Sequence, residues 1–166
     1  METKNNIRKR IKNLFLKQNR EELDIKNREI QERVLEYIVK NDVQNICIYE
    51  NMNDEVGTKQ LIWELEKAGK SVYTPQVISE TEMILIDIQY WVYEKNIDVF
   101  IIPGRAFTIN WKRLGRGKWY YDRFLAKKQY KHSKKLGICY DFQILEGIQT
   151  KAHDINMNTI ITNTDV

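Results

Sequence analysis

Short apolar runs that alternate with a helical pattern constrain the fold of this chain more than any other feature. The sequence Ile-Cys-Ile-Tyr at residues 46–49 is apolar throughout, which is typical of a strand buried on both faces of a parallel sheet. A helical pattern follows, with Thr58 as a candidate cap and Gly69 at its C-terminal end. Further strand patterns occupy residues 71–74, 83–88, 99–102, 136–140 and 159–162. This order predicts an α/β fold in three α/β/α layers, with a mostly parallel sheet.

Two amphipathic patterns precede the first strand. Apolar residues recur at helical spacing at Ile7, Ile11, Leu14 and Phe15, and again at Ile30, Val34, Leu35 and Ile38. These patterns predict two helices, or one helix broken near Asn19, where Asn19 and Glu22 form a candidate cap. Lys4 and Arg8 lie four residues apart and therefore on one helix face.

Chain length and composition favour a single compact unit. The 166 residues suffice for one well-buried domain and are too few for two of ordinary size, so we expect one domain over residues 1–166. No run of eighteen apolar residues and no charged-then-apolar leader occur, so we expect a cytoplasmic protein without a membrane partner. Cys47 and Cys139 lie in separate apolar runs without metal-ligand spacing, and we expect both to be buried, reduced thiols. We also expect a monomer.

The stretch Arg-Leu-Gly-Arg-Gly-Lys-Trp-Tyr-Tyr-Asp-Arg at residues 113–123 is the strongest candidate site. Gly115 and Gly117 allow a ligand to approach the backbone, and Arg116 and Lys118 supply positive charge beside them. The stretch is not a Walker A loop, because Lys112 stands where that loop needs a glycine. A helix over residues 119–130 is expected to follow, so that a phosphate would lie near its N-terminus.

Charge is unevenly distributed along the chain. Residues 105–135 hold eleven Lys or Arg and one acid, whereas the whole chain has a net charge of +4. Such a segment favours a polyanionic ligand, either a nucleotide triphosphate or a nucleic acid backbone. We expect a solvated helix end rather than ligand contacts for Lys127, Lys128, Lys131, Lys134 and Lys135.

Polar residues also follow several predicted strands. Ligands of such sheets bind beyond the carboxyl ends of the strands. The candidates there are residues 50–55, residues 103–118, Asp141 and Gln143.

Residues 113–122 resemble the Arg-Leu-Gly-Arg-Gly-Lys-Gly-Tyr-Tyr-Asp signature of the 5-formyltetrahydrofolate cyclo-ligase family, with Trp119 in place of a glycine. Residues 49–58 resemble the family's Tyr-x(5)-Glu-x-x-Thr segment, and residues 98–107 its Asp-x(4)-Pro-Gly-x-x-Phe segment. Lys4 and Arg8 resemble its N-terminal pair of cations, and His153-Asp154 its C-terminal ending. Trp111 stands where the family has another glycine, Thr108 where it has aspartate, and Asn158 where it has a second aspartate.

The resemblance implies a Rossmann-like fold, similar to the NagB/RpiA/CoA-transferase-like fold. It implies ATP- and Mg²⁺-dependent conversion of 5-formyltetrahydrofolate, a reduced folate, to 5,10-methenyltetrahydrofolate, with release of ADP and phosphate. It assigns catalytic roles to Arg116, Lys118 and Tyr120. ATP would be bound by Lys4, Arg8, Arg113, Leu114, Gly115, Arg116, Gly117, Lys118, Trp119, Tyr120 and Tyr121. The folate would be bound by Glu50, Glu55, Arg116, Gly117, Lys118, Trp119 and Tyr120, and Mg²⁺ by Asp122 and Asp154. We expect His153 to orient Asp154.

Trp119 is expected to stand in the first turn of the helix with its side chain pointing outward, or else to enter the site and stack on a ring of the ligand. Two other classes of function stay open. One is a paralogue that binds folate or nucleotide without turnover, because of the departures at Trp119, Thr108 and Asn158. The other, less favoured, is a nucleic-acid-binding module that stacks bases on Trp111, Trp119, Tyr120 and Tyr121.

Overall fold

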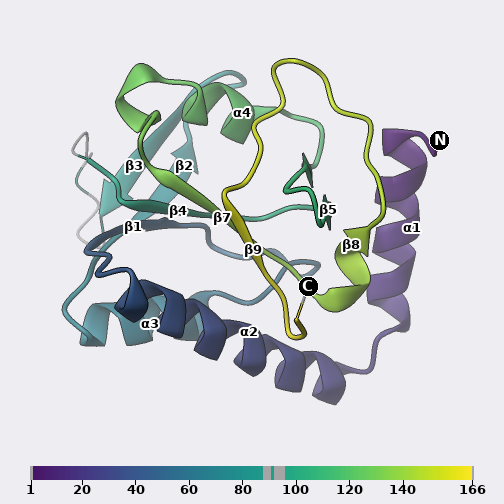
Figure 1. Cartoon of the computed structure of the whole chain (residues 1–166), viewed down its shortest axis with the longest axis horizontal. Coiled ribbons are helices and arrows are strands. Elements are labelled where there is room, and N and C mark those ends of the chain that lie inside the picture. Colours follow the sequence, from purple (N-terminus) through teal and green to yellow (C-terminus); the bar gives the residue numbers. More distant parts are fainter. Residues whose placement is uncertain (1, 88–90, 92–95, 166) are drawn as a thin grey trace.

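A six-stranded sheet with helices on both sides forms the centre of the protein (Figure 1). The structure is a computed structural model, and it describes residues 2–87, 91 and 96–165. The strands are β1 (Asn45–Ile48), β2 (Ser71–Val77), β3 (Met83–Asp87), β4 (Val99–Ile102), β7 (Lys134–Ile138) and β9 (Thr159–Ile161). Their order is β3-β2-β1-β4-β7-β9, and all neighbours run parallel except β2 and β3. The chain is therefore a mixed α/β protein with a mostly parallel central sheet, as the sequence predicts.

Both faces of the sheet are buried, which explains the unbroken apolar runs. Along β1, Ile46 and Ile48 join one core cluster and Cys47 joins the other. Along β4, Val99 and Ile101 face the first cluster, whereas Phe100 and Ile102 face the second. Cys47 and Cys139 are both buried and unpaired, as expected.

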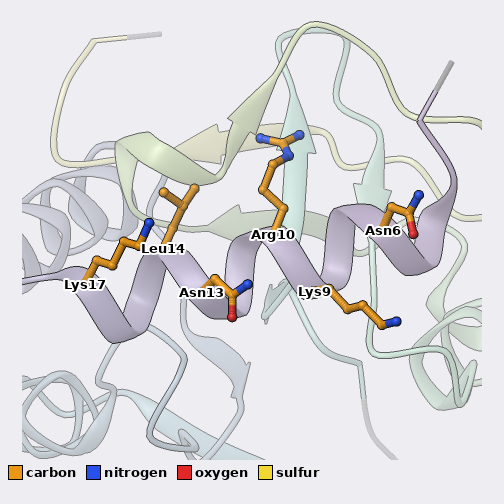
Figure 2. A pocket seen from close by; sticks show the side chains of 6 residues that line it. All are labelled: Asn6, Lys9, Arg10, Asn13, Leu14 and Lys17. Atoms are coloured by element: carbon orange, nitrogen blue, oxygen red, sulfur yellow. The ribbon is translucent and has the colours of Figure 1, made fainter.

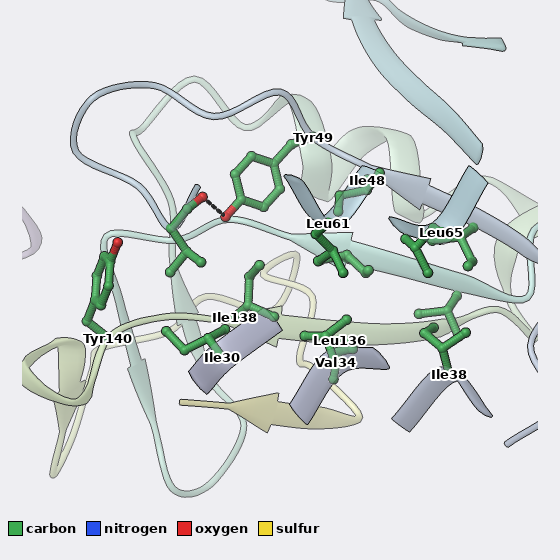
Figure 3. Packing of buried hydrophobic residues seen from close by; sticks show 14 of the residues in the cluster. Ile30, Val34, Ile38, Ile48, Tyr49, Leu61, Leu65, Leu136, Ile138 and Tyr140 are labelled. Atoms are coloured by element: carbon green, nitrogen blue, oxygen red, sulfur yellow. Dashed lines mark hydrogen bonds between the residues drawn. The ribbon is translucent and has the colours of Figure 1, made fainter. Parts of the chain in front are cut away.

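Three helices cover the first face and one end of the sheet: α1 (Lys4–Lys17), α2 (Arg20–Lys40) and α3 (Lys59–Lys67). Figure 3 shows Ile30, Val34 and Ile38 of α2 and Leu61 and Leu65 of α3 packed against Ile48, Leu136 and Ile138 of the sheet. The predicted break is real, because α1 ends at Lys17 and the Asn19 side chain accepts hydrogen bonds from the backbone N–H groups of Glu21 and Glu22.

The two ends of α3 are fixed in different ways. Thr58 stands at the N-cap but does not cap the helix with its side chain. Its hydroxyl instead donates to the Tyr49 carbonyl at 2.7 Å, which ties the start of α3 to the end of β1. At the other end, Gly69 has a φ of +75° and completes a left-handed turn, as its position predicted.

The helix predicted over residues 119–130 is too long. The structure has α4 (Tyr120–Leu125) and then a separate 3₁₀ turn, η1 (Lys128–Tyr130). The reversal at Lys127 lets the rings of Phe124 and Tyr130 lie 4.9 Å apart. Both rings pack on Phe100, at 6.1 Å and 4.9 Å respectively. A continuous helix would carry the two rings to different faces.

A second, three-stranded sheet was not predicted. Its strands are β5 (Ala106–Thr108), β6 (Arg113–Leu114) and β8 (Ile144–Leu145), in the order β6-β5-β8. The 3₁₀ turn η2 (Asp141–Gln143) precedes β8. Figure 1 shows α1 beside this small sheet. The expected strands at 136–140 and 159–162 are shifted or shortened to β7 and β9, and residue 88 lies outside the described ranges.

Candidate active site

A cavity of about 820 Å³ opens at the carboxyl ends of β1, β2 and β4, between α1 and the glycine stretch. Every residue that the family resemblance assigned to ATP, folate or metal lines it. They are Lys4, Arg8, Glu50, Glu55, Arg113, Leu114, Gly115, Arg116, Gly117, Lys118, Trp119, Tyr120, Tyr121, Asp122 and Asp154. Four segments far apart in the sequence therefore meet at one place.

Positive charge dominates the wall of the cavity. Eight Lys or Arg side chains and four carboxylates line it. Burial lowers the pKa of the Arg8 guanidinium, the positive charge of Arg105 lowers it further, and Asp154 offsets part of this effect. Cations held close enough to disfavour one another are suited to an anionic ligand.

One face of α1 supplies part of this charge. Lys4, Arg8 and Lys12 are spaced four residues apart and line the cavity, whereas Ile7 and Ile11 are buried in the core. The Arg8 Nε donates to the Gly115 carbonyl at 2.9 Å, which ties α1 to the glycine stretch. Lys12 was not among the predicted site residues, although the same spacing pointed to it.

The two glycines of the stretch act differently. Gly117 has a φ of +99°, which a residue with a side chain adopts only with strain, and a Cβ there would contact the Arg8 guanidinium at 3.4 Å. Gly115 has no such φ, but a Cβ there would lie 3.0 Å from the Arg113 guanidinium. Within the described part of the chain, the exposed Lys118 ammonium makes no ion pair, so its charge is available to a ligand.

Arg113 is a buried cation with structural contacts. Its side chain is 4% exposed, and it donates to the Asp122 carboxylate at 3.0 Å and to the Pro103 carbonyl at 3.2 Å. Its guanidinium also lies 5.6 Å from the centre of the Tyr121 ring. Its Nε is buried without a partner among the described residues. Arg113 thus holds together the loop after β4, the glycine stretch and α4.

Trp119 does not stand in the first turn of α4, so the expectation that placed it there with its side chain pointing outward is wrong. It is the N-cap residue, with the left-handed backbone angle φ of +57°, and it lines the cavity while the residue as a whole is 44% exposed. The indole lies 4.6 Å from the His153 imidazole, and Lys151 Nζ lies 5.5 Å from its centre. The backbone therefore has the conformation that suits a glycine, while the side chain adds an aromatic wall to the cavity.

A charge network that the sequence did not reveal joins three loops. Asp54 accepts hydrogen bonds from both Arg105 and Arg116, and Arg116 Nε also donates to Glu55 Oε1 at 3.0 Å. Burial alone would raise the pKa of Asp54, but the bonds from Arg116 and Arg105 hold it below its usual value. Burial also opposes the charge of Arg116, but Asp54 and Glu55 outweigh it and raise the pKa of Arg116.

The two carboxylates predicted to hold a metal are brought together. Asp122 Oδ1 accepts from the backbone N–H of Ile155, the residue after Asp154, at 3.1 Å. Asp154 Oδ2 accepts from Lys4 Nζ at 2.7 Å, and its Oδ1 lies 3.7 Å from His153 Nε2. Among the described residues, no three His, Cys, Asp or Glu side chains form a metal-binding group. Any metal here would take most of its ligands from elsewhere.

Other candidates lie outside the cavity. Asp141 pairs with Lys26 at 2.9 Å, and Gln143 Nε2 supports the loop after β4 by donating to the carbonyls of Gly104 and Arg105. The basic residues from Lys127 to Lys135 do not line the cavity either, but the helix end expected for them is wrong, because α4 ends at Leu125 and Lys134 and Lys135 begin β7. None of the helices in the described ranges has the length and apolar character needed to span a bilayer.

A second hollow, of about 380 Å³, lies on the outer surface of α1 (Figure 2). Six residues of the helix line it: Asn6, Lys9, Arg10, Asn13, Leu14 and Lys17. Lys9 also lines the main cavity, and Arg10 is paired with Glu2 at 2.8 Å. Sequence reasoning assigned no role to this surface.

Comparison with protein families gives a match over nearly the whole chain. The model of the 5-formyltetrahydrofolate cyclo-ligase family matches residues 1–91 and 87–163. A 5-formyltetrahydrofolate cyclo-ligase of Mycoplasma pneumoniae is 36% identical over 121 residues, which cover 70% of this chain and 73% of that protein. A probable 5-formyltetrahydrofolate cyclo-ligase of Schizosaccharomyces pombe is 30% identical over 174 residues, with 84% and 85% coverage.

Solved structures agree with the sequence relatives. A 5,10-methenyltetrahydrofolate synthetase from Mycoplasma pneumoniae matches with a TM-score of 0.89 at 30% identity, covering 98% of this chain and 100% of that one. A 5,10-methenyltetrahydrofolate synthetase from Aquifex aeolicus matches with a TM-score of 0.84 at 23% identity, with 98% and 90% coverage, which shows likeness of fold.

Proposed function

The chain belongs to the 5-formyltetrahydrofolate cyclo-ligase family, and we propose that it converts 5-formyltetrahydrofolate to 5,10-methenyltetrahydrofolate with ATP and Mg²⁺, releasing ADP and phosphate. One observation carries the proposal. All residues that the family resemblance assigns to ATP, folate and metal line the same positively charged cavity, although they come from both ends and the middle of the chain.

The chemistry requires activation of a poor leaving group. The γ-phosphoryl group passes from ATP to the formyl oxygen, the bond to the ADP oxygen breaks, and the formyl carbon becomes electrophilic. N10 of the folate then attacks that carbon and loses its proton to the departing phosphate or to solvent, and phosphate leaves with the former formyl oxygen and the bonding pair. Such transfers depend on positioning and on positive charge more than on a protein nucleophile.

The chain's own residues supply that positioning. Lys4 and Arg8 on α1 and Arg116 and Lys118 on the glycine stretch would hold the triphosphate from two sides, since all four line the cavity. We assign the closest contacts with the transferred group to Arg116 and Lys118. Arg113 acts indirectly, because its bonds to Asp122 and the Pro103 carbonyl fix the loops around the site.

The folate would occupy the side of the cavity formed by the loop after β1. Glu50 and Glu55 lie on that loop, and Glu55 is held by the Met52 backbone N–H at 2.9 Å. Tyr120 and Trp119 supply aromatic surface across the cavity, which suits a flat pterin ring.

Asp122 and Asp154 would hold Mg²⁺ together with phosphate oxygens. Mg²⁺ is commonly bound by one or two carboxylates plus substrate phosphates, so two carboxylates without a third protein ligand fit this metal. When bound, Mg²⁺ neutralises phosphate charge.

We further assign residues 1–166 to a single domain with a three-layer, Rossmann-like architecture. The proposal is supported by β1 and β4, whose alternate residues belong to core clusters on opposite faces of one sheet. The nucleic-acid alternative is weakened because Trp119, Tyr120 and Tyr121 line the cavity, and Tyr120 and Tyr121 are only partly exposed.

The competing function is a paralogue that binds without turnover, and Trp119 favours it, because an indole fills space where the family keeps glycine. ADP release separates the two. A cyclo-ligase releases ADP only when 5-formyltetrahydrofolate is added with ATP and Mg²⁺, and the double variant Arg116→Ala/Lys118→Ala should release far less ADP under the same conditions. A paralogue without turnover releases no ADP in either case.

A further inference from the structure

Asp54 bridges two of the arginines that line the cavity. Its Oδ2 accepts from Arg105 and its Oδ1 from Arg116, so each carboxylate oxygen serves one guanidinium. Arg105 and Arg116 both face the cavity, whereas Asp54 itself is not among the lining residues. A carboxylate that does not line the cavity therefore pairs with two cavity-lining arginines, which could otherwise bind an anion inside the cavity.

We propose that Asp54 is an internal competitor, which holds Arg105 and Arg116 and must release at least one of them when an anionic group of a substrate binds. The inference rests on the proposed function and adds a residue to it that sets ligand affinity. The competing group has anionic oxygens, and it is either a phosphate of the nucleotide or a carboxylate of the folate.

The surroundings of Asp54, Arg105 and Arg116 indicate which side chain can move when a ligand binds. The Arg105 backbone is fixed on both sides, since its N–H donates to the Leu114 carbonyl at 2.7 Å and its carbonyl accepts from Gln143 at 3.1 Å. Arg116 keeps a second carboxylate partner in Glu55. Asp54 lies in the irregular loop between β1 and α3. The arginines therefore keep their positions when Asp54 is replaced.

A competing role and a positioning role of Asp54 predict opposite changes in ligand affinity when its charge is removed. If Asp54 competes, removing its charge releases Arg105, leaves Arg116 with Glu55 as its carboxylate partner, and tightens ligand binding. If Asp54 serves to aim the arginines at the ligand, removing it weakens binding. The sign of the change in dissociation constant decides between them.

The experiment is titration calorimetry of the full chain with Mg²⁺-ATP and, separately, with 5-formyltetrahydrofolate, for wild type, Asp54→Asn and Asp54→Ala. We expect both variants to bind at least one ligand roughly fivefold more tightly, because partly exposed ion pairs are of modest strength. A gain for ATP alone identifies a phosphate as the competing group, and a gain for the folate alone identifies a carboxylate. The control is Asp141→Asn, which breaks the Lys26 pair outside the cavity and should change neither affinity.

Unchanged or weaker binding of both ligands by both Asp54 variants overturns the proposal. A second readout is the rise in melting temperature on adding ligand, which should be larger for Asp54→Asn than for wild type because the variant binds the ligand more tightly. These binding experiments test the role of Asp54 separately from the proposed function, because they measure binding without turnover. A wild-type protein that binds both ligands but forms no product would contradict the proposed cyclo-ligase activity and not the role of Asp54.

Discussion

Lys4 Nζ lies 2.7 Å from Asp154 Oδ2, so an ion pair joins the first turn of α1 to the C-terminal segment across the cavity. The same Asp154 oxygen accepts from the Lys151 backbone N–H at 2.8 Å. The pair places a cation assigned to ATP against a carboxylate assigned to metal. The ion pair therefore closes one side of the site in the protein without substrate.

This pair makes stability depend on pH in a defined direction. Burial alone would raise the pKa of Asp154, but the bonds from Lys4 and Lys151 outweigh it and lower the pKa. A carboxyl with a depressed pKa stabilises the fold above its unfolded pKa and loses this effect as the pH falls through the folded value. We expect Asp154→Asn to lower the free energy of unfolding by up to about 1 kcal/mol at pH 7, and the deficit to shrink below about pH 4.

Urea denaturation at a series of pH values measures this difference. Asp165→Asn is the control, because Asp165 also pairs with an arginine but its side chain is 98% exposed. A deficit for Asp154→Asn that stays constant from neutral to acidic pH would show that the ion pair is not its cause.

The cations of the glycine stretch should affect ATP use rather than folding. Arg116→Ala and Lys118→Ala each remove a charge-assisted contact worth about 1.5 to 3 kcal/mol, so kcat/KM for ATP should fall by roughly ten- to a hundredfold. The melting temperature should change little for Lys118→Ala, because Lys118 is exposed, and should fall modestly for Arg116→Ala, because Arg116 pairs with Asp54 and Glu55. Lys128→Ala removes an exposed charge outside the cavity and is the control. Normal ATP kinetics in both Arg116→Ala and Lys118→Ala would show that the glycine stretch does not bind ATP.

Trp119 should show an inverted preference between glycine and alanine. Its φ of +57° disfavours any residue with a Cβ by about 1 to 2 kcal/mol, whereas in an ordinary helix glycine is the worse choice by about 0.5 to 1 kcal/mol. Both Trp119→Gly and Trp119→Ala lose the contact with His153, so that loss cancels. We expect Trp119→Gly to have the higher free energy of unfolding in denaturant titrations; the reverse order would contradict the left-handed backbone.

The catalytic effect of Trp119 is a separate prediction. We expect Trp119→Gly to change catalytic efficiency by less than roughly tenfold, or about 1.4 kcal/mol. An inactive wild type that regains turnover as Trp119→Gly would instead identify the indole as a block. Steady-state kinetics of the two proteins distinguish these outcomes.

The sequence predicted the elements whose pattern is local and repeated. The run Ile46–Ile48 in β1 and the whole of β4 are apolar because both faces of the sheet are buried, and Asn19 marks the break between α1 and α2. The small sheet was missed because β6 and β8 have two residues each, too few for alternation to be recognised. The length of α4 was overestimated because its end depends on Tyr130 packing on Phe100, a contact between distant segments.

Sequence motifs predicted which residues form the candidate site, but they did not predict the contacts between those residues. Residues with a recognisable spacing, such as Lys4 and Arg8, lie where the resemblance implied. Asp54 fell within the candidate range 50–55, but its pairing with Arg105 and Arg116 was not predicted because it depends on the positions of two other loops. The conformation of Trp119 was also missed, because a bulky residue at a left-handed angle contradicts its own local preference and is held there by the surrounding chain.

Magnesium dependence tests the assignment of the two carboxylates. Asp122→Asn and Asp154→Asn should each raise the Mg²⁺ concentration needed for half-maximal activity, because each removes a hard oxygen ligand. Asp122→Asn should also destabilise the protein more, since Asp122 partners the buried Arg113. Glu146→Gln, an exposed carboxylate outside the cavity, serves as control. Unaltered Mg²⁺ titrations for both aspartate variants would exclude the pair as metal ligands.

The central claim is that this cavity closes 5-formyltetrahydrofolate to its methenyl form. The direct measurement mixes wild-type protein with 5-formyltetrahydrofolate, ATP and Mg²⁺ and follows the absorbance of 5,10-methenyltetrahydrofolate. We predict a steady rise that needs all three additions and yields one ADP for each methenyl product. A folded protein that binds both substrates yet gives no rise in absorbance would contradict the account.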